Sequence, residues 1–290
     1  MASSDALLLE IRAPYAIITL NQPKKKNALD TTLYKRLSAL LQEIDAKPEV
    51  FVTVLTGKGD FFSAGADVKS TRESLGGANA RVTSLERLSG SNLDLTRSFY
   101  RHSKILVAGL NGPAIGLSAA LLGVRPLPLV SPPFLSLMLL HVTPQHFDFV
   151  YAVPTAYFLT PFSAISLVCE GGASQALVQR MGLGKANEAL LFGKKLSMQE
   201  LLPSGFITGL IEAKGDSDEF RTELFKLLDR QLDGLQLDAI VKSKALIRAA
   251  LPDPEPTNVR EVFAGAERFA TGKPQEQFAK LASKQMRHKL

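Results

Sequence analysis

Two short segments combine glycine and small residues directly after an apolar run, where backbone groups can take part in chemistry. Residues 62–67 read FSAGAD and follow the apolar run 51–55, whereas residues 111–118 read NGPAIGLS and follow the run 105–110. Small residues let the backbone approach a ligand closely, and a strand-to-helix turn exposes unpaired N–H groups. Two such N–H groups aimed at one oxygen would stabilise a developing oxyanion, although two ordinary tight turns would give the same pattern.

A third segment, residues 167–172, places the carboxylate of Glu170 between an apolar run and the pair Gly171 and Gly172. The glycines open a predicted helix at residue 173. An anion at a helix N-terminus stabilises the helix, which would be a purely structural role. A carboxylate in an apolar pocket instead becomes more basic and can serve as a general base. These residues alone leave both roles open.

Common cofactor and metal motifs are missing from the sequence. There is no phosphate-binding G-x-x-x-x-G-K-[ST] loop, no G-x-G-x-x-G after a strand, no H-E-x-x-H and no G-x-S-x-G. The four histidines are scattered, and the single cysteine, Cys169, excludes an internal disulfide and a multi-cysteine metal site. We therefore expect no metal and no separate cofactor.

The elements that must position these segments alternate between strands and helices over the first two thirds of the chain. Apolar and β-branched runs predict strands, and apolar residues at helical spacing predict helices. The predicted strands are 7–12, 15–20, 51–55, 105–110, 149–153 and 164–168. The predicted helices are 30–44, 173–182, 184–192, 197–202, 216–234, 236–249 and 257–285. This order favours an α/β core over residues 1–214 and a helical C-terminal region over 215–290 that caps the core or packs on another subunit.

The composition fits a globular protein that binds a small ligand. The 290 residues carry 34 basic and 28 acidic side chains, a net charge of +6, and 46% are hydrophobic. This length supports one large domain or a core with a subdomain. The modest charge argues against a nucleic-acid partner but suits the phosphates of a small ligand. The N-terminus lacks the basic region of a secretory signal.

Residues 124–145 disagree with their surroundings. They hold five of the sixteen prolines and one formal charge, Arg125. The prolines would interrupt a membrane-spanning helix, so we expect no stable span. We favour a translated in-frame intron, because introns begin with GT and end with AG. Every valine codon, and so that of Val124, begins with GT, and Gln145 can be encoded by CAG. An apolar surface loop for a membrane or a partner is the alternative.

The three segments together resemble the enoyl-CoA hydratase/isomerase (crotonase) family over about residues 7–212, which implies a ββα spiral core. The resemblance implies that the backbone N–H groups of Ala66 and Leu117 bind the thioester oxygen of an acyl-CoA. It also places a loop at residues 24–29, which otherwise reads as a solvated basic loop, beside the coenzyme A moiety. The substrate and coenzyme A contacts implied in this way are Lys24, Lys26, Ala28, Ala64, Asp67, Val68 and Gly116.

Departures from the family pattern point to a subfamily. Hydratases of this fold use two glutamates, and one of these positions is Ala120 here. The segment 169–174, CEGGAS, is similar to fungal and peroxisomal Δ3,Δ2-enoyl-CoA isomerases. This resemblance implies that Glu170 alone moves the double bond of a 3-enoyl-CoA to give the 2-trans-enoyl-CoA in fatty-acid β-oxidation. It also implies a homotrimer or hexamer.

Three alternatives to a Δ3,Δ2-enoyl-CoA isomerase remain. They are a hydratase, a dienoyl-CoA isomerase with a second acid at Asp67 or Asp148, and an inactive acyl-CoA-binding relative.

Two features of the C-terminal region concern partners and ligands. The terminal tripeptide His288, Lys289 and Leu290 resembles a peroxisomal address, which implies an import receptor as partner and a peroxisomal location. Lys280 and Lys284 are candidates to contact the adenine and the 3′-phosphate.

Overall fold

The computed structural model describes residues 5–69, 79–123, 147–213 and 216–286. The anomalous segment 124–145, the predicted boundary at residues 214 and 215, and the terminal tripeptide lie outside the described residues. The hypotheses about them therefore stay predictions.

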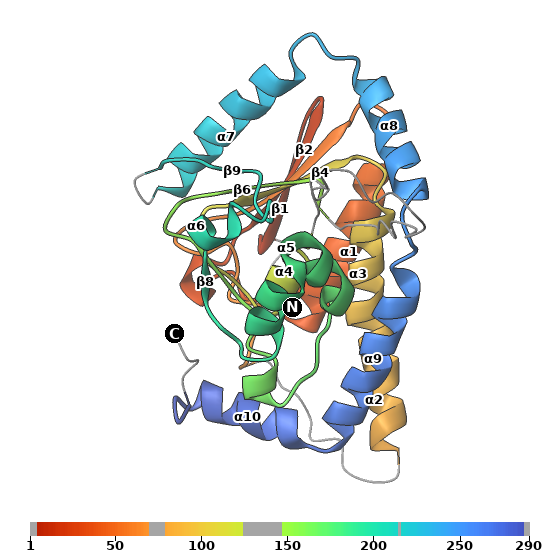
Figure 1. The fold of residues 1–290 in the computed structure, drawn as a ribbon, viewed down its shortest axis with the longest axis vertical. Coiled ribbons are helices and arrows are strands. Elements are labelled where there is room, and N and C mark those ends of the chain that lie inside the picture. The colour runs from red at the N-terminus through yellow and green to blue at the C-terminus, as the bar shows by residue number, and fades with distance from the viewer. Residues whose placement is uncertain (1–4, 70–78, 124–146, 214–215, 287–290) are drawn as a thin grey trace, which may run out of the picture.

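A six-stranded sheet forms the centre of the fold (Figure 1). Its spatial order is β1-β2-β3-β4-β6-β9, with β1 and β2 antiparallel and every later pair parallel. The strands are β1 (Leu7–Arg12), β2 (Tyr15–Leu20), β3 (Val52–Gly57), β4 (Ile105–Leu110), β6 (Phe149–Ala152) and β9 (Gly209–Leu210). Every residue of β3 and β4 is buried, as expected for central parallel strands covered on both faces.

A smaller three-stranded sheet lies beside the turns that follow the main strands. It consists of β5 (Ala114–Ile115), β7 (Tyr157–Leu159) and β8 (Leu196–Ser197), in the order β5-β7-β8. The strand predicted at 164–168 is wrong. Residues Ser163–Ile165 form a 3-10 turn, and Ser166 has a left-handed φ of 59°, which an extended strand does not allow.

Among the helices of the first half, α1 packs on α3, and α2 packs on the C-terminal helix α9 (Glu255–Ala270). Helix α1 (Thr31–Asp45) buries the apolar stripe that the sequence predicts, and the Asp30 side chain caps it by accepting from the Leu33 N–H. The sequence analysis missed α2 (Ala80–Leu88), a π-helical turn η2 (Ser89–Leu93) and α3 (Asp94–Arg101). Short elements complete this half: a 3-10 turn η1 (Pro23–Lys25) and α4 (Leu117–Ala120).

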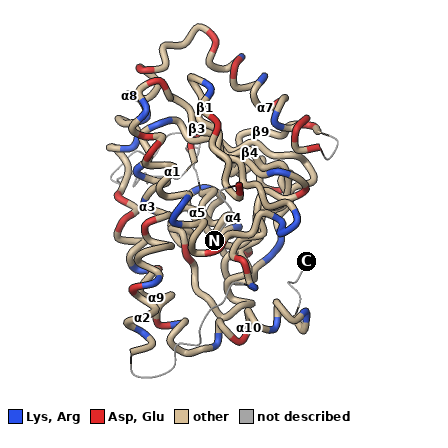
Figure 2. Tube along the Cα trace, turned by 180° about the vertical axis from the view of Figure 1, so that it is seen from behind, with Lys and Arg blue, Asp and Glu red and all other residues tan. Residues whose placement is uncertain are grey.

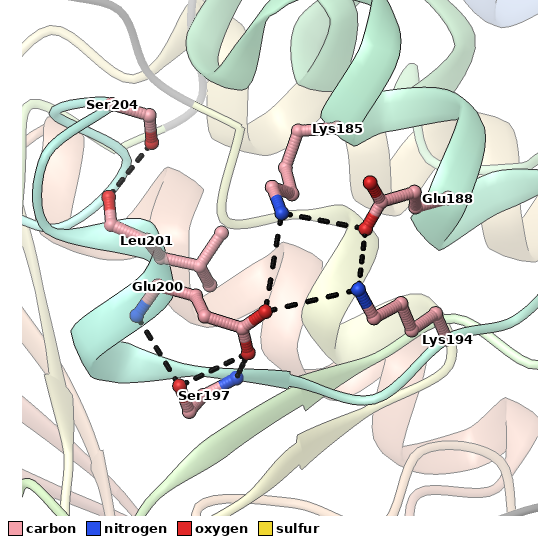
Figure 3. A network of polar contacts seen from close by, with 7 residues as sticks. All are labelled: Lys185, Glu188, Lys194, Ser197, Glu200, Leu201 and Ser204. Atoms are coloured by element: carbon pink, nitrogen blue, oxygen red, sulfur yellow. Dashed lines mark hydrogen bonds and ion pairs between the residues drawn. The ribbon is translucent and has the colours of Figure 1, made fainter.

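The second half contains the long helix α5 (Ala173–Leu190) and the short helix α6 (Met198–Leu201). Non-helical angles at Gly182 kink α5, close to the break that the sequence predicts between 182 and 184. A surface network of Lys185, Glu188, Lys194 and Glu200 links the C-terminal half of α5 to α6 (Figure 3).

Four helices follow at the C-terminus: α7 (Ser217–Leu232), α8 (Leu237–Ala249), α9 (Glu255–Ala270) and α10 (Lys273–Ala282). The single helix predicted at 257–285 is wrong, because Gly272 adopts a φ of +74° and separates α9 from α10. Helices α7 and α8 lie at one end of the molecule and α10 at the other, while α9 runs beside α2 (Figure 1). Basic and acidic residues are interspersed along the outer helices α8 and α9 (Figure 2). None of the described helices is long and apolar enough to span a bilayer.

Candidate active site

The two glycine-containing turns predicted from the sequence lie against each other. The Ser63 N–H donates to the Pro113 carbonyl at 3.1 Å, and the Ile115 N–H donates to the Ser63 carbonyl at 2.9 Å. Gly65 has a φ of +81°, and a Cβ added there would lie 2.5 Å from the Ile115 carbonyl oxygen. Only glycine therefore allows this approach of the two turns.

The two backbone groups predicted to bind an oxyanion are available as donors. The N–H groups of Ala66 and Leu117 have no acceptor among the described residues. Ala66 follows Gly65 and forms a parallel bridge with Leu29, whereas Leu117 is the first residue of α4, where helical N–H groups have no intrahelical partner.

The loop at 24–29 is tied to the first turn through a buried side chain, Asn27. Its amide donates to the Lys58 carbonyl at 3.0 Å and the Phe61 carbonyl at 2.7 Å. In return, the Ser63 hydroxyl donates to the Asn27 carbonyl at 2.9 Å, and the Ala64 N–H donates to the Lys26 carbonyl at 2.8 Å. The exposed lysines of this loop are thus carried on a fixed backbone next to Ala66.

The three lysines of this loop differ in their contacts. Lys26 Nζ lies 4.7 Å from the centre of the Phe61 ring, and Lys25 Nζ lies 3.5 Å from the Asp67 carboxylate. The structure describes no ion pair of Lys24. All three side chains are solvent-exposed, as phosphate binding by this loop would require.

The Glu170 carboxylate is held by an amide from η2. Asn92 Nδ2 donates to Glu170 Oε2 at 2.7 Å, and Asn92 is itself buried. Both side chains line a cavity of about 40 Å³, here called the Glu170 cavity. Its walls come from five parts of the chain: Leu29, Thr31 and Tyr34; Ala66; Ser84, Arg87, Leu88, Ser91 and Asn92; Leu167 and Glu170; and Phe269, Gln275 and Phe278. The cavity therefore combines one carboxylate, one predicted oxyanion donor and an apolar wall from α9 and α10.

A second carboxylate, Glu261 of α9, lies behind the Glu170 loop. It accepts from the Gly172 N–H at 2.7 Å and the Ser174 N–H at 2.8 Å, and it is only 7% exposed. Burial raises the pKa of Glu261 although these donors oppose the shift. Burial and the negative charges of Glu261 and Glu170 raise the pKa of the Cys169 thiol to about 11, so this cysteine is not a thiolate nucleophile.

Comparisons with known proteins agree with this arrangement. The family described as enoyl-CoA hydratase/isomerase matches residues 10–122. A Delta(3,5)-Delta(2,4)-dienoyl-CoA isomerase from Pyricularia oryzae is 42% identical, over 99% of this chain and 100% of the relative. The chain belongs to the enoyl-CoA hydratase/isomerase family.

Two further comparisons support this family assignment. A 3,2-trans-enoyl-CoA isomerase from Saccharomyces cerevisiae is 29% identical over 99% of this chain and 98% of the relative. A solved enoyl-CoA hydratase/isomerase from Pseudoalteromonas atlantica T6c superimposes with a TM-score of 0.74 at 25% identity, over 98% of this chain and 100% of that one. The predicted family and the crotonase-type α/β fold are confirmed.

Within this family fold, the predicted site residues are only partly gathered in the Glu170 cavity. Ala66 and Glu170 line it, whereas the remaining eight do not: Lys24, Lys26, Ala28, Ala64, Asp67, Val68, Gly116 and Leu117. Their roles stay predictions. Lys280 and Lys284 are exposed on the C-terminal side of α10 and do not line the cavity.

The two candidates for a second acid do not line the Glu170 cavity either. Asp67 pairs with Lys25 and accepts from the Lys69 N–H within its own turn. Asp148 makes ion pairs of 2.8 Å with both Lys244 and Arg248. Although burial opposes the shift, these two cations keep the pKa of Asp148 below its ordinary value.

Ala120, where hydratases of the family carry a second glutamate, is fully buried beside the Glu170 loop. A Cβ added at Gly171 would lie 3.3 Å from the Ala120 methyl and 2.8 Å from Leu117 Cδ1. The small residues at 120 and 171 therefore let the loop pack closely on α4. The described residues contain no group of histidine, cysteine, aspartate and glutamate side chains able to hold a metal ion.

Sequence reasoning missed Asn92, Glu261 and the wall residues Phe269, Gln275 and Phe278. The apolar spacing of α9 and α10 was visible, but no sequence pattern indicated which helix would close the cavity. Asn92 had no signal of its own, because one asparagine in a polar stretch is ordinary.

Proposed function

We propose that this protein is an enoyl-CoA isomerase that converts a 3-enoyl-CoA into the 2-trans-enoyl-CoA, a reaction of fatty-acid β-oxidation. One observation carries the proposal: among the described residues that line the Glu170 cavity, Glu170 is the only acid. A shift of a double bond by one position needs one group that removes a proton and returns it nearby.

The reaction uses this group twice. Glu170 takes a proton from C2 of the 3-enoyl thioester, and the electron pair of the C2–H bond forms a dienolate. The backbone N–H groups of Ala66 and Leu117 stabilise the negative thioester oxygen. The protonated Glu170 then delivers the proton to C4, and the double bond comes to lie between C2 and C3.

Asn92 supports this chemistry by donating to the carboxylate. Its 2.7 Å hydrogen bond to Oε2 fixes the orientation of Glu170 and favours the ionised form that accepts the proton. No atom other than the transferred proton is exchanged, so the reaction balances without a metal, a redox cofactor or water.

The test is the Glu170→Gln variant, assayed with a 3-enoyl-CoA beside the wild type. The amide cannot accept the proton, so we expect turnover to fall by about 10³-fold or more. Binding of a saturated acyl-CoA should remain, because the cavity keeps its shape. Activity within a few-fold of the wild type would exclude Glu170 as the base. Glu267→Gln, an exposed glutamate on α9, is the matched control.

A dienoyl-CoA isomerase is the second candidate, since the relative from Pyricularia oryzae carries that name. This reaction moves a proton over a longer path and fits less readily with a cavity that holds a single acid. Turnover of a 3,5-dienoyl-CoA in preference to a 3-enoyl-CoA by the wild type would favour this candidate. The buried Ala120 disfavours a hydratase, which would have to activate water with a second carboxylate.

The proposal extends to location and assembly. We expect import into peroxisomes through His288, Lys289 and Leu290, recognised by the import receptor, and assembly as a homotrimer or hexamer. Deleting the three terminal residues should leave a tagged protein in the cytosol. Analytical ultracentrifugation of the full chain tests the assembly, and a monomer would contradict it.

A further inference from the structure

We propose that Glu261 is a positioning residue for the Glu170 carboxylate, an inference that rests on the proposed function because it takes Glu170 as the base. Glu261 stands 91 positions later in the sequence and belongs to α9, the helix that also supplies Phe269 to the wall of the Glu170 cavity.

The hydrogen bonds of Glu261 fix the segment that directly follows Glu170. Its two carboxylate oxygens accept from the Gly172 N–H at 2.7 Å and from the N–H and hydroxyl of Ser174. Gly171 and Gly172 have φ values of +75° and +73°. Glycine adopts positive and negative φ about equally well, so these two residues do not by themselves hold the backbone in this conformation. The buried carboxylate therefore holds in place a two-glycine hinge that would otherwise let Glu170 move.

The same helix also contacts the segment that carries the partner of Glu170. Asn258, one turn before Glu261, donates from Nδ2 to the Leu93 carbonyl at 3.1 Å, next to Asn92. Helix α9 is thus bonded on one side to η2, which supplies Asn92, and on the other to the start of α5. It sets the spacing across which Asn92 meets Glu170 at 2.7 Å.

Glu261 acts through Glu170 and does not itself reach the substrate. It lines a small adjoining cavity of about 10 Å³, here called the Glu261 cavity, which shares Asn92 and Glu170 with the Glu170 cavity, whereas Glu261 itself is absent from the walls of the Glu170 cavity. Both of its oxygens already accept hydrogen bonds from the α5 N-terminus. A role as the second proton donor of a longer double-bond shift is therefore disfavoured.

The experiment compares Glu261→Gln with the wild type and with Glu267→Gln on the exposed face of the same helix. With a 3-enoyl-CoA, we expect kcat to fall by about 10- to 100-fold while KM stays within about threefold, because the base is misplaced but the cavity is intact. The Glu267→Gln control should match the wild type in both kcat and KM.

The outcomes separate this inference from the proposed function. A wild type that does not isomerise a 3-enoyl-CoA contradicts the proposed function itself. An active wild type beside a folded Glu261→Gln variant with unchanged kcat overturns only the positioning role. If Glu261→Gln does not fold, Ser174→Ala decides, since it removes a single bond to Glu261; a kcat equal to that of the wild type then overturns the inference.

Discussion

Two glutamates in this protein accept hydrogen bonds at the start of a helix, and they differ in almost every other respect. Glu200 caps its own helix, α6, by accepting from the Ser197 N–H at 2.9 Å, while the Ser197 hydroxyl accepts from the Glu200 N–H (Figure 3). Glu261 instead caps α5 from a helix 87 to 89 residues further along the chain. Glu200 lies at the surface beside Lys185 and Lys194, whereas Glu261 is buried.

The comparison shows that surroundings decide what a capping carboxylate does. The backbone donor at Ser197 lowers the pKa of Glu200, with nearby lysines adding to the effect. Burial raises the pKa of Glu261 although more backbone donors face it. The local cap stabilises one turn of helix, while the remote cap connects two elements on which a reactive side chain depends.

Removing each carboxylate separately should give the largest difference in stability between the two sites. We expect Glu261→Ala to lower the free energy of unfolding by about 3 kcal/mol, because it leaves buried N–H groups without acceptors. Glu200→Ala should cost about 1 kcal/mol or less, since water can replace an exposed cap. Urea denaturation of both variants measures this. Equal losses would show that burial is not the deciding factor.

The pH dependence of stability should have opposite signs at the two sites. The pKa of Glu261 is raised in the folded state, so its contribution is fully present below its ordinary value of 4.5 and is lost as the pH rises through the folded value. The pKa of Glu200 is lowered, so its contribution is present above 4.5 and is lost as the pH falls through the folded value.

Urea denaturation at several pH values tests this, with Glu261→Gln and Glu200→Gln as references. Each pKa unit of displacement at the buried site corresponds to about 1.4 kcal/mol. As the pH rises, the free energy of unfolding of the wild type should fall relative to that of Glu261→Gln. If the free energy of unfolding, measured relative to each Gln variant, changed with pH in the same direction at both sites, the opposite signs predicted for Glu261 and Glu200 would be wrong.

The serine partners should give a smaller contrast. Ser174→Ala removes one hydroxyl bond to the buried Glu261, and we expect a loss of about 1 kcal/mol in stability together with reduced turnover. Ser197→Ala removes the cap of α6 and should cost a similar amount in stability. Turnover should stay unchanged in Ser197→Ala, because none of the described residues that line the Glu170 cavity belongs to α6. A matched loss of kcat in both variants would remove the distinction between them.

The smallest effect is expected at Lys194, which pairs with Glu188 and Glu200 at the surface (Figure 3). Lys194→Ala should leave stability and turnover within experimental error at physiological ionic strength, because exposed ion pairs contribute little. Thermal unfolding at low and high salt checks this. A clear loss of stability at high salt would show that the network matters beyond charge pairing.

The sequence allowed the central strands and α1 to be predicted because their patterns are local. The runs at 52–57 and 105–110 are rich in apolar and β-branched residues, and the stripe of α1 repeats at helical spacing. The two glycine turns and Glu170 were also found, since glycine and a carboxylate at strand ends are visible in the residues themselves.

The rest depends on contacts between distant parts of the chain. The stretch 80–101 is rich in polar residues, and α2 packs on α9 while α3 packs on α1. The apolar face of α3, which buries Leu95, Phe99 and Tyr100, was a local signal that the prediction overlooked. Glu261 reaches the N-terminus of α5 only because α9 packs beside α2, and this packing cannot be predicted from the residues around position 261. Ser166 has a left-handed backbone conformation that prevents a strand at 164–168. A serine at this position gives no indication of that conformation.

The π-helical turn η2 has a consequence for how this gene can change. It holds one residue more per turn than an α-helix, and Asn92 lies within it, between α2 and α3. Loss of a single codon within 89–93 would convert the π-helical turn into an α-helical one, because the five residues of the π-turn complete about the same rotation as four residues of an α-helix. Helices α2 and α3 would then keep nearly the same relative orientation, but the turn that presents Asn92 to Glu170 would be lost. The extra residue of this turn therefore serves the placement of one amide rather than the packing of the two helices.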